Sequence, residues 1–66
     1  MKLWWKTMST VKVDLMDGDE HAWGYQIIKS RAYICVRGER HQMYRVIKNL
    51  TEAKAWVEAM YVLQEL

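Results

Sequence analysis

Hydrophobic and polar residues alternate strictly in the run TVKVDL at residues 10–15. A period of two residues is typical of a strand that buries one face and exposes the other. Similar short segments, rich in β-branched and aromatic residues, follow further along the chain. We therefore predict strands at about residues 10–16, 22–29, 32–37 and 41–47, and the pattern leaves open whether residues 3–7 add a short edge strand.

Turn signals separate these segments. Asp17-Gly18-Asp19 lies between the first two, and Asp-Gly between apolar runs favours a hairpin because Gly adopts positive φ freely. Residues 29–31 and 38–39 are the expected positions of the next two turns. Consecutive strands joined by short turns predict an antiparallel meander.

The hydrophobic period changes after residue 48. Asn49 is a suitable N-cap, and Glu52 three positions later completes a capping box, so we predict a helix over residues 50–65. Its apolar stripe comprises Leu50, Ala53, Trp56, Val57, Met60 and Leu63. Small or apolar residues also occupy the far side, which would suit a dimer contact: Ala55, Ala59, Val62 and Leu66.

Strands followed by one helix indicate an α+β fold, an antiparallel β-meander of three to four strands with one C-terminal α-helix packed on one face. In the second strand, Trp23, Tyr25 and Ile27 should share one face. In the last two strands we expect the helix to cover Ile34, Val36, Tyr44 and Val46. The opposite face should then present Tyr33, Cys35, Arg37, Met43 and Arg45.

Composition sets the scale of this fold. The 66 residues predict one domain, 1–66, and a hydrophobic content of 52% favours a rich core. The lone Cys35 cannot close an intramolecular disulfide, so a reducing, cytoplasmic setting is expected. The apolar start is too short for a signal segment or a membrane span. Self-association as a homodimer would add buried area that so small a chain lacks.

Positive charge is concentrated in the middle of the chain. Residues 29–48 contain six Lys or Arg against one Glu, whereas the segments on either side are each net acidic. Aromatic residues are interleaved with these cations, a combination that neutralises phosphates and stacks on bases. The expected nucleic-acid contacts are Tyr33, Arg37, Arg40, Arg45 and Lys48. The alternative is a solvated sheet face on which Arg stems cover apolar area.

Residues 38–56 begin with Gly38, continue through a basic strand into the capped helix, and place Ala53 and Trp56 in its first turns. This segment resembles the arm-type DNA-binding domains at the N-termini of tyrosine integrases, whose fold is related to that of plant ethylene-response factors. The resemblance implies a three-stranded sheet lying in the major groove of DNA under one C-terminal helix. It also implies that Arg37, Arg40 and Arg45 contact DNA.

Acidic residues and histidine cluster at the first hairpin, but their spacing does not match a calcium loop, so neither metal nor cofactor is expected. The cluster comprises Asp14, Asp17, Asp19, Glu20 and His21. The chain lacks phosphate-loop and oxyanion-hole motifs, and a sheet with one helix offers little concave volume, so we expect no enzyme.

Trp4 and Trp5 are adjacent, so in an extended segment they point to opposite faces and one of them is exposed. Exposed Trp is a typical anchor of protein interfaces. The residues of such an interface would be Trp4, Trp5, Asp17, Asp19, Val62 and Leu66.

The sequence therefore predicts a non-enzymatic binding module. Nucleic-acid binding through the basic and aromatic sheet face is the first hypothesis, and a phage or mobile-element accessory protein is the expected type. The alternative is a protein-interaction module or inhibitor that acts as a homodimer or on a host protein.

Overall fold

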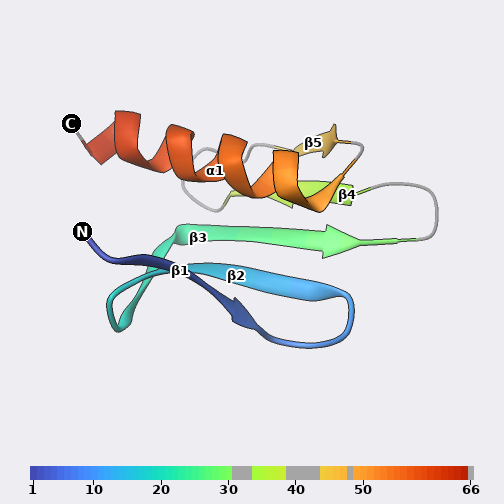
Figure 1. Cartoon of the computed structure of the whole chain (residues 1–66), viewed down its shortest axis with the longest axis horizontal. Helices are drawn as coiled ribbons and strands as arrows, with labels where there is room; N and C mark the ends of the chain where they lie inside the picture. Colours follow the sequence, from blue (N-terminus) through green and yellow to red (C-terminus); the bar gives the residue numbers. More distant parts are fainter. Residues whose placement is uncertain (31–33, 39–43, 48, 66) are drawn as a thin grey trace.

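The computed structural model describes residues 1–30, 34–38, 44–47 and 49–65. Its elements, in chain order, are β1 (Leu3–Thr7), β2 (Lys12–Asp17), β3 (Glu20–Lys29), β4 (Ile34–Arg37), β5 (Tyr44–Ile47) and α1 (Leu50–Glu65). The five strands form one antiparallel sheet in the order β1-β2-β3-β4-β5, and α1 packs against one face of it (Figure 1). The predicted α+β class and the meander are confirmed, and residues 3–7 add the strand that the pattern left open.

The β2–β3 hairpin turns at Gly18 and Asp19, between the paired residues Asp17 and Glu20. Gly18 has a φ of 61°, which costs a residue without a Cβ little. Glycine at the first central position is the usual choice in two-residue hairpins of the II′ type. The predicted Asp-Gly turn is therefore confirmed.

Strand β3 is irregular near its start. Trp23 and Gly24 have φ values of 52° and 68°, and the register with β2 shifts between Asp14 and Met16. The extra residues form a bulge that interrupts the alternation, so Ala22 joins Tyr25 in the core. Trp23 still reaches the helix, where its ring lies edge-on to Tyr61 with the centroids 5.5 Å apart.

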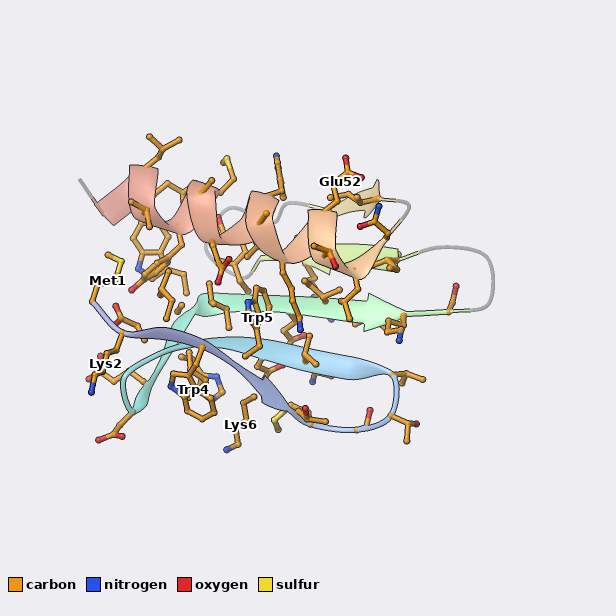
Figure 2. The ribbon with its side chains drawn as sticks, viewed as in Figure 1. Met1, Lys2, Trp4, Trp5, Lys6 and Glu52 are labelled. Atoms are coloured by element: carbon orange, nitrogen blue, oxygen red, sulfur yellow. The ribbon has the colours of Figure 1, made fainter. Side chains whose placement is uncertain are left out.

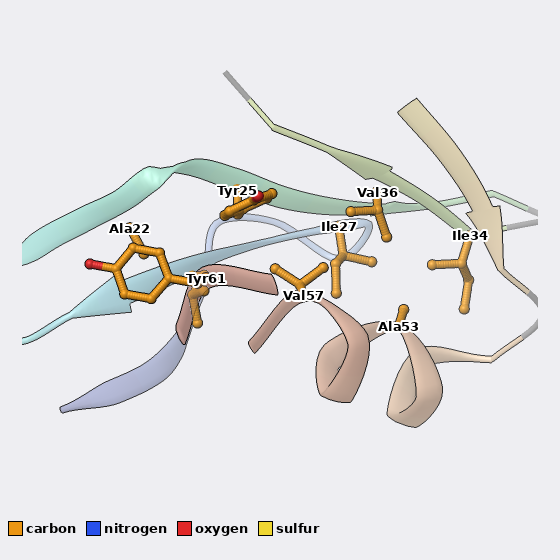
Figure 3. Packing of buried hydrophobic residues seen from close by; sticks show 9 residues of the cluster. Ala22, Tyr25, Ile27, Ile34, Val36, Ala53, Val57 and Tyr61 are labelled. Atoms are coloured by element: carbon orange, nitrogen blue, oxygen red, sulfur yellow. The ribbon is translucent and has the colours of Figure 1, made fainter. Parts of the chain in front are cut away.

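The core lies between α1 and the sheet. Ala53, Val57 and Tyr61 point from the helix toward buried residues of β3 and β4 (Figure 3). The largest fully buried side chains are Tyr25, Leu15, Ile27, Val36 and Val57. Burying each stabilises the fold by about 1.5–3 kcal/mol relative to leaving it exposed, so this contact fixes the helix on the sheet.

Helix α1 begins where the capping box predicts. The Asn49 side chain accepts a hydrogen bond from the Glu52 backbone N–H at 2.8 Å and donates one to the Glu52 carboxylate at 3.3 Å. The predicted stripe is wrong at one end, because Leu63 is 66% exposed and Tyr61 is buried instead. Leu63 lies about 120° around the helix from the buried Val57.

Gly38 follows β4 and lies directly against the ring of Tyr25. A Cβ at Gly38 would lie 2.8 Å from Cε1 of Tyr25, so only glycine fits there without a shift of the ring. The Tyr25 hydroxyl donates to the Gln64 side chain at 3.0 Å. The ring is therefore held between the end of β4 and the last turns of α1.

Candidate nucleic-acid interface

The sheet has a second face, opposite α1, which we call the helix-free face. The residues here follow from the register, since neighbours across antiparallel strands share a face. Its described members are Trp4, Lys6, Lys12, Asp14, Met16, His21, Gln26, Ile28, Cys35 and Arg37. Figure 2 shows Trp4 and Lys6 pointing away from α1, whereas Trp5 points toward it.

Three described cations stand on this face, on three different strands: Lys6 on β1, Lys12 on β2 and Arg37 on β4. Lys6 and Arg37 are exposed and Lys12 is half-buried. With strands about 4.8 Å apart, β1 and β4 are separated by roughly 14 Å. The cations therefore span the width of the sheet and are not confined to one strand.

Among the described residues of this surface, Trp4 is the exposed aromatic side chain. It is 46% exposed, and its Nε1 donates a hydrogen bond to the Gly18 backbone carbonyl at 2.8 Å. That bond ties the ring to the β2–β3 turn, so the orientation of Trp4 is fixed before any ligand binds. A pre-ordered ring loses less conformational entropy when a partner stacks on it.

Asp14 lies in the middle of the same face and is 3% exposed. Its Oδ2 is 3.8 Å from Nδ1 of the exposed His21, and its buried Oδ1 has no hydrogen-bond partner. A buried carboxylate oxygen without a partner costs free energy of folding. In the described part of this face, Asp14 is the one acidic residue, and it is buried beneath the basic surface.

Of the five predicted nucleic-acid contacts, Arg37 is placed on the helix-free face and is exposed. Tyr33, Arg40 and Lys48 lie outside the described residues. Arg45 is described as a residue of strand β5. Of the segment that carries the resemblance to arm-type domains, residues 39–43 and 48 are likewise outside the described part.

The register of β5 differs from the predicted one. Arg45 is paired with Val36, a core residue, while Tyr44 is paired with Arg37 and Val46 with Cys35. The predicted grouping of Arg45 with Arg37 and Cys35, and of Tyr44 and Val46 with Val36, requires a register that differs by one residue from the observed pairing, so the predicted register is wrong. A shift of one residue in the register exchanges the two faces of a strand.

The predicted protein-interface residues are spread over the molecule. Trp4 is exposed and Trp5 is partly buried, as expected for neighbours in a strand. Trp5 Nε1 donates to Glu58 at 3.3 Å, and Lys54 Nζ lies 5.9 Å from the centroid of the Trp5 ring. Trp5 therefore joins β1 to the side of α1.

The other interface candidates lie on the hairpin tip and the helix. Asp19 is exposed in the β2–β3 turn, Val62 is exposed on α1, and Leu66 lies outside the described residues. Asp19 lies in the turn to which Trp4 is hydrogen-bonded, whereas Val62 lies on α1, on the other side of the sheet from Trp4. The predicted interface residues therefore do not form one continuous patch.

Asp17 binds within the chain. Its Oδ2 accepts a hydrogen bond from the Tyr61 hydroxyl at 2.8 Å, and its Oδ1 accepts one from the Lys2 backbone N–H at 3.1 Å. The Tyr61 bond, with help from Lys2 and from the positive chain terminus, holds the pKa of Asp17 below its ordinary value of 3.8. Asp17 thus ties the start of the chain and the end of β2 to α1.

Lys6 and Lys12 are the functional candidates that the sequence reasoning missed. Both occupy the outer positions of alternating strands, so the pattern that predicted the strands contained the signal. The net charge of a segment does not indicate them, because the first 28 residues carry a net negative charge while residues 29–48 are strongly basic. Three of the four acidic residues of the first 28 lie in or beside the β2–β3 turn: Asp17, Asp19 and Glu20.

Other chemistries find little support in the described residues. Among them, no group of three or more His, Cys, Asp or Glu side chains is arranged to hold a metal ion. Within the same part of the chain, no helix combines the length and the apolar character needed to cross a membrane.

A comparison with protein-family models, curated proteins and solved structures found no match to this chain. What the protein does must therefore be inferred from its own residues and their geometry.

Proposed function

We propose that this protein binds single-stranded nucleic acid through the helix-free face of its sheet. Trp4 is the ring on which a base stacks, and Lys6, Lys12 and Arg37 contact phosphates. The observation that carries the proposal is the combination of a fixed, exposed indole with three cations on one open sheet face. Sheets that bind single strands combine these two features, since stacking and phosphate contacts need no particular sequence.

A single strand suits this surface better than a duplex. The Trp4 ring can stack only on a base whose own face is open, and bases inside a duplex are stacked on each other. The cations are spread across several strands, so a chain crossing the sheet would meet them in turn. Arg37 belongs to both the sequence prediction and this surface, and the register of β1 and β2 adds Lys6 and Lys12 to it.

The proposal includes a reducing, cytoplasmic setting. Cys35 is buried as a free thiol in β4, and a lone cysteine cannot form an intramolecular disulfide. Under this proposal the protein is a binding module without catalytic activity, and a phage or mobile element is its source.

The test is fluorescence anisotropy with labelled single-stranded and duplex oligonucleotides at several salt concentrations. Three phosphate contacts predict that log K falls with log salt with a slope of about −2 for single strands. Trp4→Leu should cost about 1–3 kcal/mol of binding free energy through lost stacking. Lys6→Glu should weaken binding and flatten the salt dependence.

Lys29→Glu is the matched control. Lys29 is exposed on β3, and its register partner Ile34 belongs to the core, so Lys29 lies on the other side of the sheet. The charge change equals that of Lys6→Glu. Equal weakening by both variants, or no binding of any oligonucleotide at low salt, would contradict the proposal.

A protein-interaction function is the second candidate, and the outer side of α1 favours it. Leu63 and Val62 are exposed on a helix whose opposite side packs on the sheet. Leu63→Lys separates the candidates, because it should leave oligonucleotide binding unchanged and abolish capture of a protein partner.

A further inference from the structure

Strand β1 forms one edge of the sheet, and its backbone bonds show which of its groups remain available. The Gly18 N–H donates to the Lys2 carbonyl at 2.9 Å, and the Met8 N–H donates to the Lys12 carbonyl at 3.0 Å. Hydrogen-bonded pairs recur at every second residue of an antiparallel ladder. Trp4 and Lys6 therefore direct their backbone groups toward β2.

The remaining residues of β1 face outward. Leu3, Trp5 and Thr7 alternate with the residues bonded to β2, so their N–H and C=O groups point to the open edge. The pairing with β2 is continuous from Leu3 to Thr7, without a bulge or a proline. Such an edge is a template on which another strand can pair.

We propose that β1 pairs in antiparallel fashion with β1 of a second copy, around a two-fold axis at Trp5. Trp5 then faces Trp5 of the second copy, and Leu3 faces Thr7. All five residues of β1 overlap, and the outward groups of Leu3, Trp5 and Thr7 are hydrogen-bonded on both copies. This inference goes beyond the proposed function and does not depend on it.

The charges of the strand select this register. An axis at Lys6 would place Lys6 opposite itself, and an axis at Trp4 would place Lys2 opposite Lys6. With the axis at Trp5, each Lys6 faces Trp4 of the other copy in a close, non-hydrogen-bonded pair. Like charges directly opposite each other across a ladder repel. Of the three central registers, the one at Trp5 avoids every Lys–Lys pair.

The two-fold axis runs perpendicular to the sheet, so both helices lie on the same side and the two helix-free faces become one surface. The second copy supplies its Lys6 beside Trp4, and the same contact is made in reverse. The dimer therefore brings the two stacking rings and their cations to the middle of a ten-stranded sheet.

The first test is sedimentation equilibrium of the protein without nucleic acid, from about 1 μM to about 1 mM. We expect a mass of twice the 7.9 kDa chain at the upper concentrations. A monomer over the whole range would overturn the proposal. Since no oligonucleotide is present, this result is independent of the nucleic-acid proposal.

Trp4→Glu and Trp4→Lys form a matched pair that tests the register. Both remove the indole, but the first places a carboxylate opposite Lys6 of the second copy and the second places an ammonium there. The dimer dissociation constant should be at least about tenfold higher for Trp4→Lys than for Trp4→Glu. Equal constants would overturn the Trp5-centred register.

Thr7→Pro tests the edge itself. The Thr7 N–H points outward, so proline there removes a bond to the second copy and none to β2. Dimerisation should weaken at least about tenfold. Thr10→Pro, in the loop after β1, is the control and should leave the dimer intact. An intact Thr7→Pro dimer would overturn the proposal; if circular dichroism shows that this variant is unfolded, the Trp4 pair decides.

Discussion

The two faces of the sheet are built by different rules. On the face beneath α1, Leu15, Ile27 and Val36 are fully buried. The polar groups that enter this layer are paired, since the Tyr61 hydroxyl binds Asp17 and the Tyr25 hydroxyl binds Gln64. Buried polar groups with partners cost little, so this face is organised for stability.

The helix-free face carries features that do not serve stability. Three of the described cations share one surface, and the buried Asp14 has an oxygen without a hydrogen-bond partner. Surface charges contribute little to folding, and an unpaired buried acceptor opposes it. The groups on the open face are therefore suited to contacts with other molecules, and the proposed nucleic-acid function rests on them.

The largest expected effect comes from Ile27→Ala compared with Ile28→Ala. Ile27 is fully buried beneath α1, whereas its neighbour Ile28 is half-buried on the helix-free face. Ile27→Ala should lower the free energy of unfolding by about 2–4 kcal/mol, and Ile28→Ala by about 1 kcal/mol or less. Urea denaturation measures both, and equal losses would show that the helix-free face is also a core.

A smaller effect of opposite sign is expected for Asp14→Val. Valine is similar in size and removes the buried carboxylate with its unpaired oxygen, so the free energy of unfolding should rise by about 1 kcal/mol. His21 is exposed and remains hydrated in the variant. Thermal denaturation gives the answer, and a destabilised variant would show that Asp14 contributes to the fold.

The smallest effect concerns acid stability. The folded-state pKa of Asp17 lies below its unfolded value, so the carboxylate stabilises the fold above that unfolded value, about 3.9. This contribution is lost as the pH falls through the folded-state pKa. Asp17→Asn should therefore reduce stability at neutral pH and flatten the loss of stability below about pH 4.

Asp19→Asn is the control for that measurement, because Asp19 lies exposed in the neighbouring turn. Denaturation curves from pH 2 to pH 7 compare the two variants. If Asp17→Asn leaves the loss of unfolding free energy below about pH 4 unchanged, the role assigned to the Tyr61 bond is contradicted.

Local signals predicted most of the fold. The capping box at Asn49 and Glu52 gave the start of α1, and Gly18 marked the hairpin, because both act between residues close in sequence. The bulge at Trp23 and Gly24 could not be predicted, since the packing of Trp23 on Tyr61 involves residues far apart in the chain. For the same reason the exposure of Leu63 could not be predicted, since the sequence pattern favours Leu63 for the core as much as the buried Tyr61.

The residues of the candidate site depend on contacts between strands that the sequence does not show directly. The density of positive charge along the chain is highest in residues 29–48. A surface is assembled from several strands, however, and Lys6 and Arg37 belong to the same sheet face because of the strand order. The pairing of Arg45 depends on the register of β5, and a shift of one residue changes that pairing. The alternation of Trp4 and Trp5 predicted that one indole is exposed, and Trp4 is the exposed one.

The close approach of Gly38 to Tyr25 has a consequence for motion. A ring that touches backbone on one edge and holds Gln64 by its hydroxyl cannot turn over in place. Its two edges exchange only when α1 lifts from the sheet, an event on the microsecond-to-millisecond scale or slower. The exchange rate between the ring resonances of Tyr25 in NMR spectra therefore reports how often α1 separates from the sheet.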